Sequence, residues 1–136
     1  MDDEGLAEAF WAVARALRHR TRVALEPWDL SPSLARAMNV LARQGELRPG
    51  TLADHLHIAP RSATEVVDDL QRLGLAERRP DPGDRRAVRV ALTPDGARAA
   101  EAIQAARQAE GDRFFAALSE EDRAALARIL RTLRAD

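Results

Sequence analysis

Two adjacent arginines in the second half of the chain carry side chains suited to binding a polyanion. Arg85 and Arg86 follow a Pro82-Gly83 pair, at which the chain must reverse direction. Residues 76–96 are therefore predicted to form a β-hairpin with both guanidinium groups near its tip. A rigid ribbon tipped with arginine suits the narrow, electronegative minor groove of DNA. The pattern favours a winged helix-turn-helix DNA-binding protein.

The other groups able to do chemistry form no recognisable catalytic or metal site. His55 and His57 are two residues apart on a predicted helix, whereas paired metal ligands on a helix need a separation of three or four. His19 stands alone. The sequence has no cysteine, no phosphate-binding glycine loop and no serine in a nucleophile-elbow context. We therefore expect no catalytic residue, no metal ion, no cofactor and no enzymatic activity.

Apolar residues at helical spacing, together with local capping signals, predict six helices around this hairpin. Ser31 caps the second helix, Gly74 ends the fourth, Thr93 caps the fifth and Ser119 begins the sixth. The fold class is therefore mainly α with a small β-hairpin wing, and the third and fourth helices form the helix-turn-helix. The predicted helices cover residues 6–25, 32–45, 49–56, 60–73, 94–118 and 119–133, and the buried stripe of the fourth is Ala63, Val66 or Val67, Leu70 and Leu73.

Composition and charge set limits on these interpretations. The chain has 136 residues, of which 46% are hydrophobic, so it can form one domain with a core. No apolar run approaches the roughly 20 residues that span a bilayer, and the acidic residues 2–4 are unlike a signal peptide, so we expect a cytoplasmic protein. The formal net charge is −1. DNA binding must therefore depend on local charge, such as the five arginines and three acids between Glu77 and Arg89.

The first, fifth and sixth helices carry more apolar surface than one small winged helix can cover. We expect residues 1–30 and 97–136 to pack against the same helices of a second subunit, giving a two-fold homodimer. Residues 31–96 then form the winged helix-turn-helix lobe, and residues 1–136 form one domain. The alternative is that these helices fold back on their own winged helix.

Two segments carry a resemblance to a known family. They are LADHLHIAPRSATEVVDDLQRLGLAERR, from Leu52 to Arg79, and DPGDRRAVRVALTPDG, from Asp81 to Gly96. The second contains D-x-R at 84–86 and LTP at 92–94. The chain thus resembles the multiple-antibiotic-resistance regulator (MarR) family of bacterial transcription factors. The resemblance implies a triangular homodimer that binds a pseudo-palindromic operator in double-stranded DNA, usually as a repressor, and releases it when a small aromatic or lipophilic effector binds.

The resemblance also assigns candidate DNA contacts on the fourth helix. Arg61 is the candidate for a bidentate guanine contact, and Ser62 and Thr64 for phosphates or base edges. Thr64 has the alternative role of a first-turn packing residue, and Asp68 that of an i,i+4 partner of Arg72. Since the helix also carries acids, more of the binding is expected from the wing. The groove-facing positions implied are Arg61, Ser62, Thr64, Glu65 and Asp68, and the acids are Glu65, Asp68 and Asp69.

In the wing, Arg86 matches the minor-groove arginine of the family, and Asp84 matches the carboxylate that orients it. Arg85 is either a further DNA contact or a solvated turn charge. The acidic recognition helix and the net charge of −1 also leave an alternative function open. That alternative is a winged-helix dimer that acts through protein contacts, with weak or no DNA binding.

The resemblance places an effector cleft near the first helix. A planar anion needs an apolar wall and one cation, and this region offers both. Packing in the core is the alternative role for Phe10, and packing at a subunit interface for Trp11. The candidate effector-binding residues are Phe10, Trp11, Arg15, His19 and Trp28.

Overall fold

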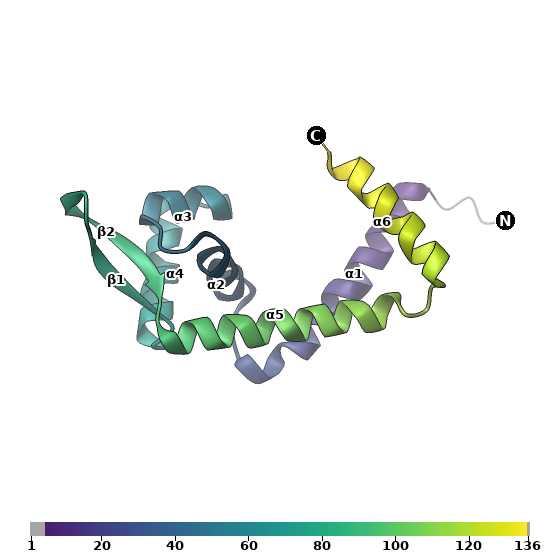
Figure 1. Cartoon of the computed structure of the whole chain (residues 1–136), viewed down its shortest axis with the longest axis horizontal. Helices are drawn as coiled ribbons and strands as arrows, with labels where there is room; N and C mark the ends of the chain where they lie inside the picture. The colour runs from purple at the N-terminus through teal and green to yellow at the C-terminus, as the bar shows by residue number, and fades with distance from the viewer. Residues whose placement is uncertain (1–4, 136) are drawn as a thin grey trace. The chain divides into compact units, whose positions relative to one another are not determined.

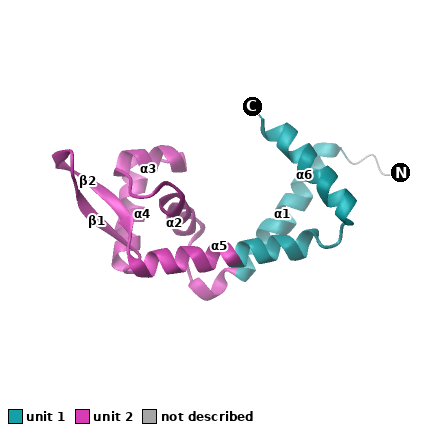
Figure 2. Ribbon diagram, in the orientation of Figure 1, with its two compact units in different colours: residues 1–24, 106–136 teal, residues 25–105 magenta. Residues whose placement is uncertain are grey.

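The computed structural model describes residues 5–135, so the acidic residues 2–4 lie outside the described residues. The chain divides into two compact units (Figure 2). We call residues 25–105 the winged-helix unit. We call residues 5–24 and 106–135 the helical unit.

The winged-helix unit consists of short helices followed by a hairpin (Figure 1), as the sequence predicts. Ser31 caps α2, because its Oγ accepts a hydrogen bond from the Leu34 N–H at 3.2 Å. Gly74, with φ of 75°, ends the turn after α4 in a conformation that favours glycine. The elements are a 3₁₀ turn (Glu26–Trp28), α2 (Pro32–Gln44), α3 (Pro49–Leu56), α4 (Pro60–Arg72), β1 (Ala76–Asp81), β2 (Asp84–Leu92) and the first part of α5 (Pro94–Phe115).

The two strands form an antiparallel hairpin whose register shifts between Pro80 and Asp81. The connector between α2 and α3 adds one further bridge to β2. The Leu47 N–H donates to the Val90 carbonyl at 3.0 Å, and the Val90 N–H donates back to Leu47 at 2.7 Å. The base of the wing is therefore hydrogen-bonded on both sides of β2, to β1 and to the connector.

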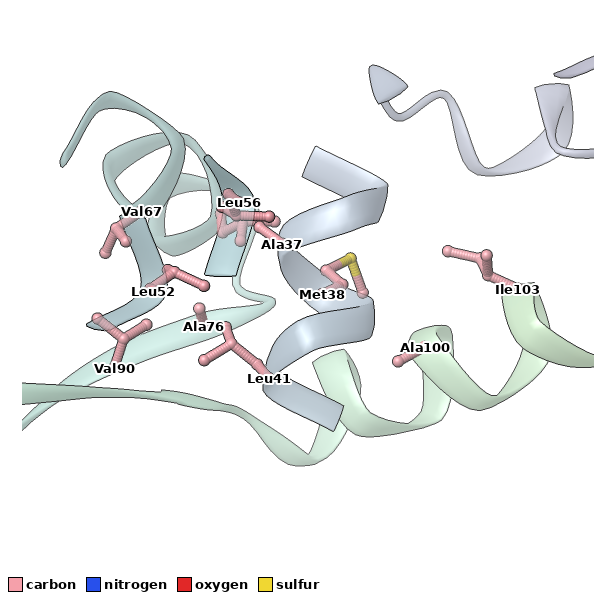
Figure 3. Close-up of a cluster of buried hydrophobic side chains, with 11 residues drawn as sticks. Ala37, Met38, Leu41, Leu52, Leu56, Val67, Ala76, Val90, Ala100 and Ile103 are labelled. Atoms are coloured by element: carbon pink, nitrogen blue, oxygen red, sulfur yellow. The ribbon is translucent and has the colours of Figure 1, made fainter. Parts of the chain in front are cut away.

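Buried side chains from α2, α3, α4, both strands and α5 form one core (Figure 3). The predicted buried stripe of α4 is confirmed at Ala63, Val67 and Leu70. The prediction that Leu73 is buried is wrong, because its side chain is 55% exposed. Gly74 turns the chain just after this residue, and Leu75 packs against the core instead. The largest fully buried side chains are Met38, Leu52, Val67, Leu70 and Val90.

Gly96 marks a close approach between α5 and the segment after α4. A Cβ at this position would overlap the carbonyl oxygen of Leu75. Thr93 joins the same elements, since its hydroxyl donates to the Gly74 carbonyl at 2.6 Å and accepts from the Gly96 N–H at 3.0 Å. The predicted Thr93 cap is thus confirmed, and only glycine lets α5 begin so close to the backbone of Leu75.

The helical unit contains α1 (Leu6–Ala24), the last part of α5 and α6 (Glu120–Arg134). Ser119 Oγ caps α6 by accepting from the Asp122 N–H at 3.1 Å, as predicted. The predicted fifth helix is too long at its end. It stops at Phe115, and Leu118 lies in the connection to α6.

Among its described residues the helical unit buries a single residue, Glu110. The Arg20 Nε donates to one carboxylate oxygen at 2.7 Å, and an Arg113 guanidinium nitrogen donates to the other at 2.5 Å. The Arg113 and Arg20 hydrogen bonds lower the pKa of Glu110 despite its burial. Arg20 also lies over the ring of Phe114, 5.4 Å from its centroid. This ion-pair cluster joins α1 to α5.

Across residues 5–135, none of the helices combines the length and apolar character needed to cross a membrane.

Candidate nucleic-acid interface

One face of α4 is exposed along its length while the opposite face is in the core. Ala63, Val67 and Leu70 are buried, because they recur at helical spacing on the inner face. The four predicted contact residues of the first turns are on the exposed side, namely Arg61, Ser62, Thr64 and Glu65. These residues are therefore available to a ligand that approaches α4 from solvent.

Thr64 has a backbone partner within its own helix. Its hydroxyl donates to the Pro60 carbonyl at 3.1 Å, one turn earlier. Its side chain is exposed, so it is no core packing residue. The oxygen keeps its acceptor capacity, while the donated bond holds the hydroxyl on the first turn.

Two of the three acids on α4 are paired with arginines of the same unit. An Arg78 guanidinium nitrogen donates to Asp68 Oδ1 at 2.7 Å, and a second donates to Gln71 Oε1 at 2.5 Å. Arg72 pairs with Asp69 at 3.0 Å. The proposed pairing of Asp68 with Arg72 is therefore wrong. Arg72 pairs instead with Asp69, three residues before it, and the partner of Asp68 is Arg78 on β1.

The tip of the wing presents its two arginines to solvent. Arg85 and Arg86 are exposed, and within residues 5–135 neither forms an ion pair. Asp84 Oδ1 accepts a hydrogen bond from the Arg86 backbone N–H at 2.9 Å. The carboxylate thus holds the backbone that carries the arginine, and it accepts from this N–H rather than from the guanidinium.

Asp81 is a buried charge at the wing that the sequence analysis missed. Its side chain is 1% exposed and pairs with Arg48 at 2.7 Å and with Arg89 at 3.1 Å. The Gly83 N–H donates to its other oxygen at 2.8 Å. These hydrogen bonds, first of all that of Arg48, hold the pKa of Asp81 well below its ordinary value. An Asp two residues before the glycine of a turn was the available signal, but its arginine partners are distant in sequence.

The five candidate effector residues fall in different units. Phe10 and Trp11 lie on α1 in an edge-to-face contact, with ring centroids 5.9 Å apart. His19 Nδ1 lies 3.0 Å from a guanidinium nitrogen of Arg22, and Arg15 is exposed on the same helix. Trp28 belongs to the winged-helix unit, where it packs against the core. The contact with the core gives Trp28 a packing role that its sequence context did not indicate.

The arrangement of α3, α4 and an arginine-tipped hairpin defines a winged helix-turn-helix protein. Comparisons of the sequence and the structure with known proteins agree with this class of protein. The sequence pattern described as the MarR family matches residues 28–87. An uncharacterized HTH-type transcriptional regulator of Mycobacterium leprae is 35% identical over 103 residues, which are 76% of this chain and 69% of the relative. A putative transcriptional regulatory protein for the hcr operon of Thauera aromatica is 30% identical, over 87% of this chain and 71% of the relative.

Solved structures share the fold over nearly the whole chain. A MarR family protein from Bacillus stearothermophilus has a TM-score of 0.86 and 28% identity, covering 99% of this chain and 96% of that one. A mutant MarR from E. coli, solved with operator DNA, has a TM-score of 0.76 and 23% identity, covering 94% and 92%. The chain therefore belongs to the MarR family of DNA-binding transcriptional regulators.

Proposed function

We propose that this regulator represses transcription by binding a pseudo-palindromic operator as a homodimer, with α4 in the major groove and the wing in the minor groove. In this proposal Arg61 reads a guanine, and Ser62 and Thr64 contact phosphates or base edges. Arg86, and Arg85 beside it, enter the minor groove. Its action is by binding, without a catalytic step.

The observation that carries the proposal is the distribution of paired and unpaired charges on the winged-helix unit. Two of the three acids of the recognition helix, Asp68 and Asp69, are paired with Arg78 and Arg72, and the third, Glu65, is exposed without an ion-pair partner among the described residues. The wing-tip arginines are exposed without an ion-pair partner in the described part of the chain. Local charge, rather than the net charge of −1, therefore favours a polyanionic ligand.

The helical unit supports a dimer. Its helices α1 and α6 bury no residue within the single chain. Large apolar side chains remain on their surface, and monomeric soluble proteins rarely leave such patches uncovered. The exposed ones are Leu6, Phe10, Trp11, Val13, Val23, Ile129, Leu130 and Leu133. A second copy of the same helices would cover them and would present two winged-helix units to two half-sites.

A titration of the full chain against DNA tests the proposal. The ligand is a labelled duplex of the DNA upstream of the protein's own gene, and the control is a shuffled duplex of equal length and composition. Fluorescence anisotropy at two salt concentrations should show preference for the upstream duplex and steep weakening with salt, because phosphate contacts release counterions. Binding to neither duplex would favour the protein-interaction module instead.

A further inference from the structure

We propose that Asp81 is a positioning residue for DNA binding, whose buried carboxylate fixes the wing tip on the start of α3. The proposal rests on the DNA-contacting role of Arg85 and Arg86 proposed above. It concerns a residue that does not itself face the DNA, since Asp81 is buried and those two arginines are exposed.

The Asp81 carboxylate lies at the end of the hairpin where the pairing between β1 and β2 stops. Asp81 is the last residue of β1, and the pairing register shifts between Pro80 and Asp81. Beyond it the strands are joined only by Pro82 and Gly83. Oδ1 accepts the Gly83 N–H at 2.8 Å and thereby fixes this turn. The position of the tip is thus tied to the position of this side chain.

The other carboxylate oxygen joins three segments of the chain. Oδ2 accepts from Arg48 Nε at 2.7 Å and from Arg89 Nε at 3.1 Å. Arg89 lies on β2, and Arg48 is the residue immediately before α3. Because α3 is the first helix of the helix-turn-helix and packs against α4, this one oxygen connects the wing to that motif.

The connector before α3 holds the wing at successive points. Leu47 bridges Val90 through two backbone hydrogen bonds. On either side of Leu47, Glu46 lies 3.5 Å from Arg79 and 3.7 Å from Arg89, and Arg48 reaches Asp81. Of these points Asp81 is the farthest along β1 towards the tip, so it sets the direction in which residues 82–86 leave the anchored part of the wing.

The effect of an Asp81 substitution on DNA affinity distinguishes a positioning role from a purely electrostatic one. Replacing Asp81 by asparagine keeps the size of the side chain but removes the carboxylate that Arg48 and Arg89 share, so that Glu46 is the remaining acid beside Arg89. General electrostatics predicts that removal of one negative charge from a DNA-binding unit strengthens binding. Positioning predicts the opposite sign, because the wing arginines lose their fixed orientation.

The test compares Asp81→Asn with Asp54→Asn in the full chain. Asp54 is an exposed acid of α3 in the same unit, so its substitution changes the charge equally without touching the wing. With the upstream duplex as ligand, we expect Asp81→Asn to weaken binding by roughly tenfold or more, the scale of a lost arginine contact. We expect Asp54→Asn to leave binding unchanged or slightly tighter.

A second measurement needs no DNA. Hydrogen exchange of the Gly83 and Arg86 amides, followed by NMR, should be faster in Asp81→Asn than in the wild type, while core amides such as that of Leu70 keep their protection. The variant Arg48→Gln removes the same contact from a half-exposed side chain and should also speed exchange at Gly83. If Asp81→Asn does not fold, the exchange rate of the Gly83 amide in Arg48→Gln tests whether this contact orders the wing tip.

Unchanged exchange at the tip in a folded variant would overturn the proposal, as would equal or tighter DNA binding by Asp81→Asn. Failure of the proposed function looks different. In that case the wild type itself does not bind the upstream duplex, while the exchange experiment still tests whether Asp81 orders the wing.

Discussion

The winged-helix unit and the helical unit bury their side chains to very different degrees. In the winged-helix unit Leu52 and Leu70 have no exposed surface, and Met38 is 1% exposed. In the helical unit Leu133 is 68% exposed and Leu6 is 88% exposed. The single buried residue among the described part of the helical unit is a carboxylate, Glu110, held between arginines.

This difference separates a unit that completes its core within one chain from a unit whose helices α1 and α6 leave their apolar side chains exposed. Burial of an apolar side chain stabilises a fold by about 1.5 to 3 kcal/mol, and an amphipathic helix gains this only against a partner. The helices of the helical unit are amphipathic but exposed. In the proposed homodimer their apolar residues contribute through assembly, whereas those of the winged-helix unit contribute to folding.

The largest effect is expected from deleting the chain from Ser119 onward. The deletion removes α6 and its apolar residues, so the dimer should be lost, as measured by light scattering. DNA binding should be lost with it, because two half-sites about one helical turn apart must be engaged together.

A point substitution sharpens this test. Leu133→Glu should weaken the dimer, whereas Arg128→Gln, at an exposed polar position of the same helix, should leave it intact. If the truncated protein stays dimeric, the helical unit does not depend on α6 for assembly and the contrast between the units is wrong.

The next largest effect concerns folding. Leu70→Ala should lower the free energy of unfolding by about 2 to 5 kcal/mol, because it opens a cavity in a filled core. Leu133→Ala, measured at protein concentrations low enough to favour the monomer, should change it by about 0.5 kcal/mol or less. Urea denaturation followed by circular dichroism measures both. Equal losses of unfolding free energy in the two variants would mean that Leu133 of α6 is packed in a core within the monomer.

A smaller effect is expected at the wing. Arg86→Ala should weaken operator binding by roughly 1 to 3 kcal/mol without changing thermal stability, because an exposed guanidinium contributes a DNA contact and no packing. Asp84→Ala should also weaken binding, although it removes a negative charge, since Asp84 holds the Arg86 backbone.

Arg43→Ala is the matched control for the wing variants, as an exposed arginine of α2 outside the proposed interface. Anisotropy titrations give the affinities, and thermal melts give the stabilities. Tighter binding by Asp84→Ala would show that this carboxylate is only a repulsive charge.

The smallest effect is expected from an effector. A salicylate-type aromatic carboxylate should lower operator affinity by on the order of 1 kcal/mol, because a ligand shifts the equilibrium only by its differential affinity for two states. Arg15→Ala and Trp28→Ala should each reduce the effect, since both are candidate effector-binding residues. Tryptophan fluorescence reports binding. Quenching without a change in DNA affinity would indicate a ligand site without coupling.

Local sequence signals predicted the elements of this chain well. Ser31 and Ser119 cap the helices that follow them, Gly74 ends the turn after α4, and Pro82 and Gly83 form the hairpin turn. Each signal acts within about four residues, the reach of a capping hydrogen bond or a tight turn. Where the periodicity runs past a helix end, as at Leu73 and Leu118, the prediction of the element was too long.

The sequence by itself determined the helices, the hairpin and the exposed arginines at its tip, because propensity, capping and turn geometry are properties of neighbouring residues. Only the tertiary structure decided which charges pair. Arg48 reaches Asp81 across 33 residues, and Arg78 takes Asp68 across ten. The chain has 21 arginines and 22 acids, so the sequence alone allows many different arginine–acid pairs. The fold selects among them, because a salt bridge needs two side chains within 4 Å and the packing of the core sets those distances.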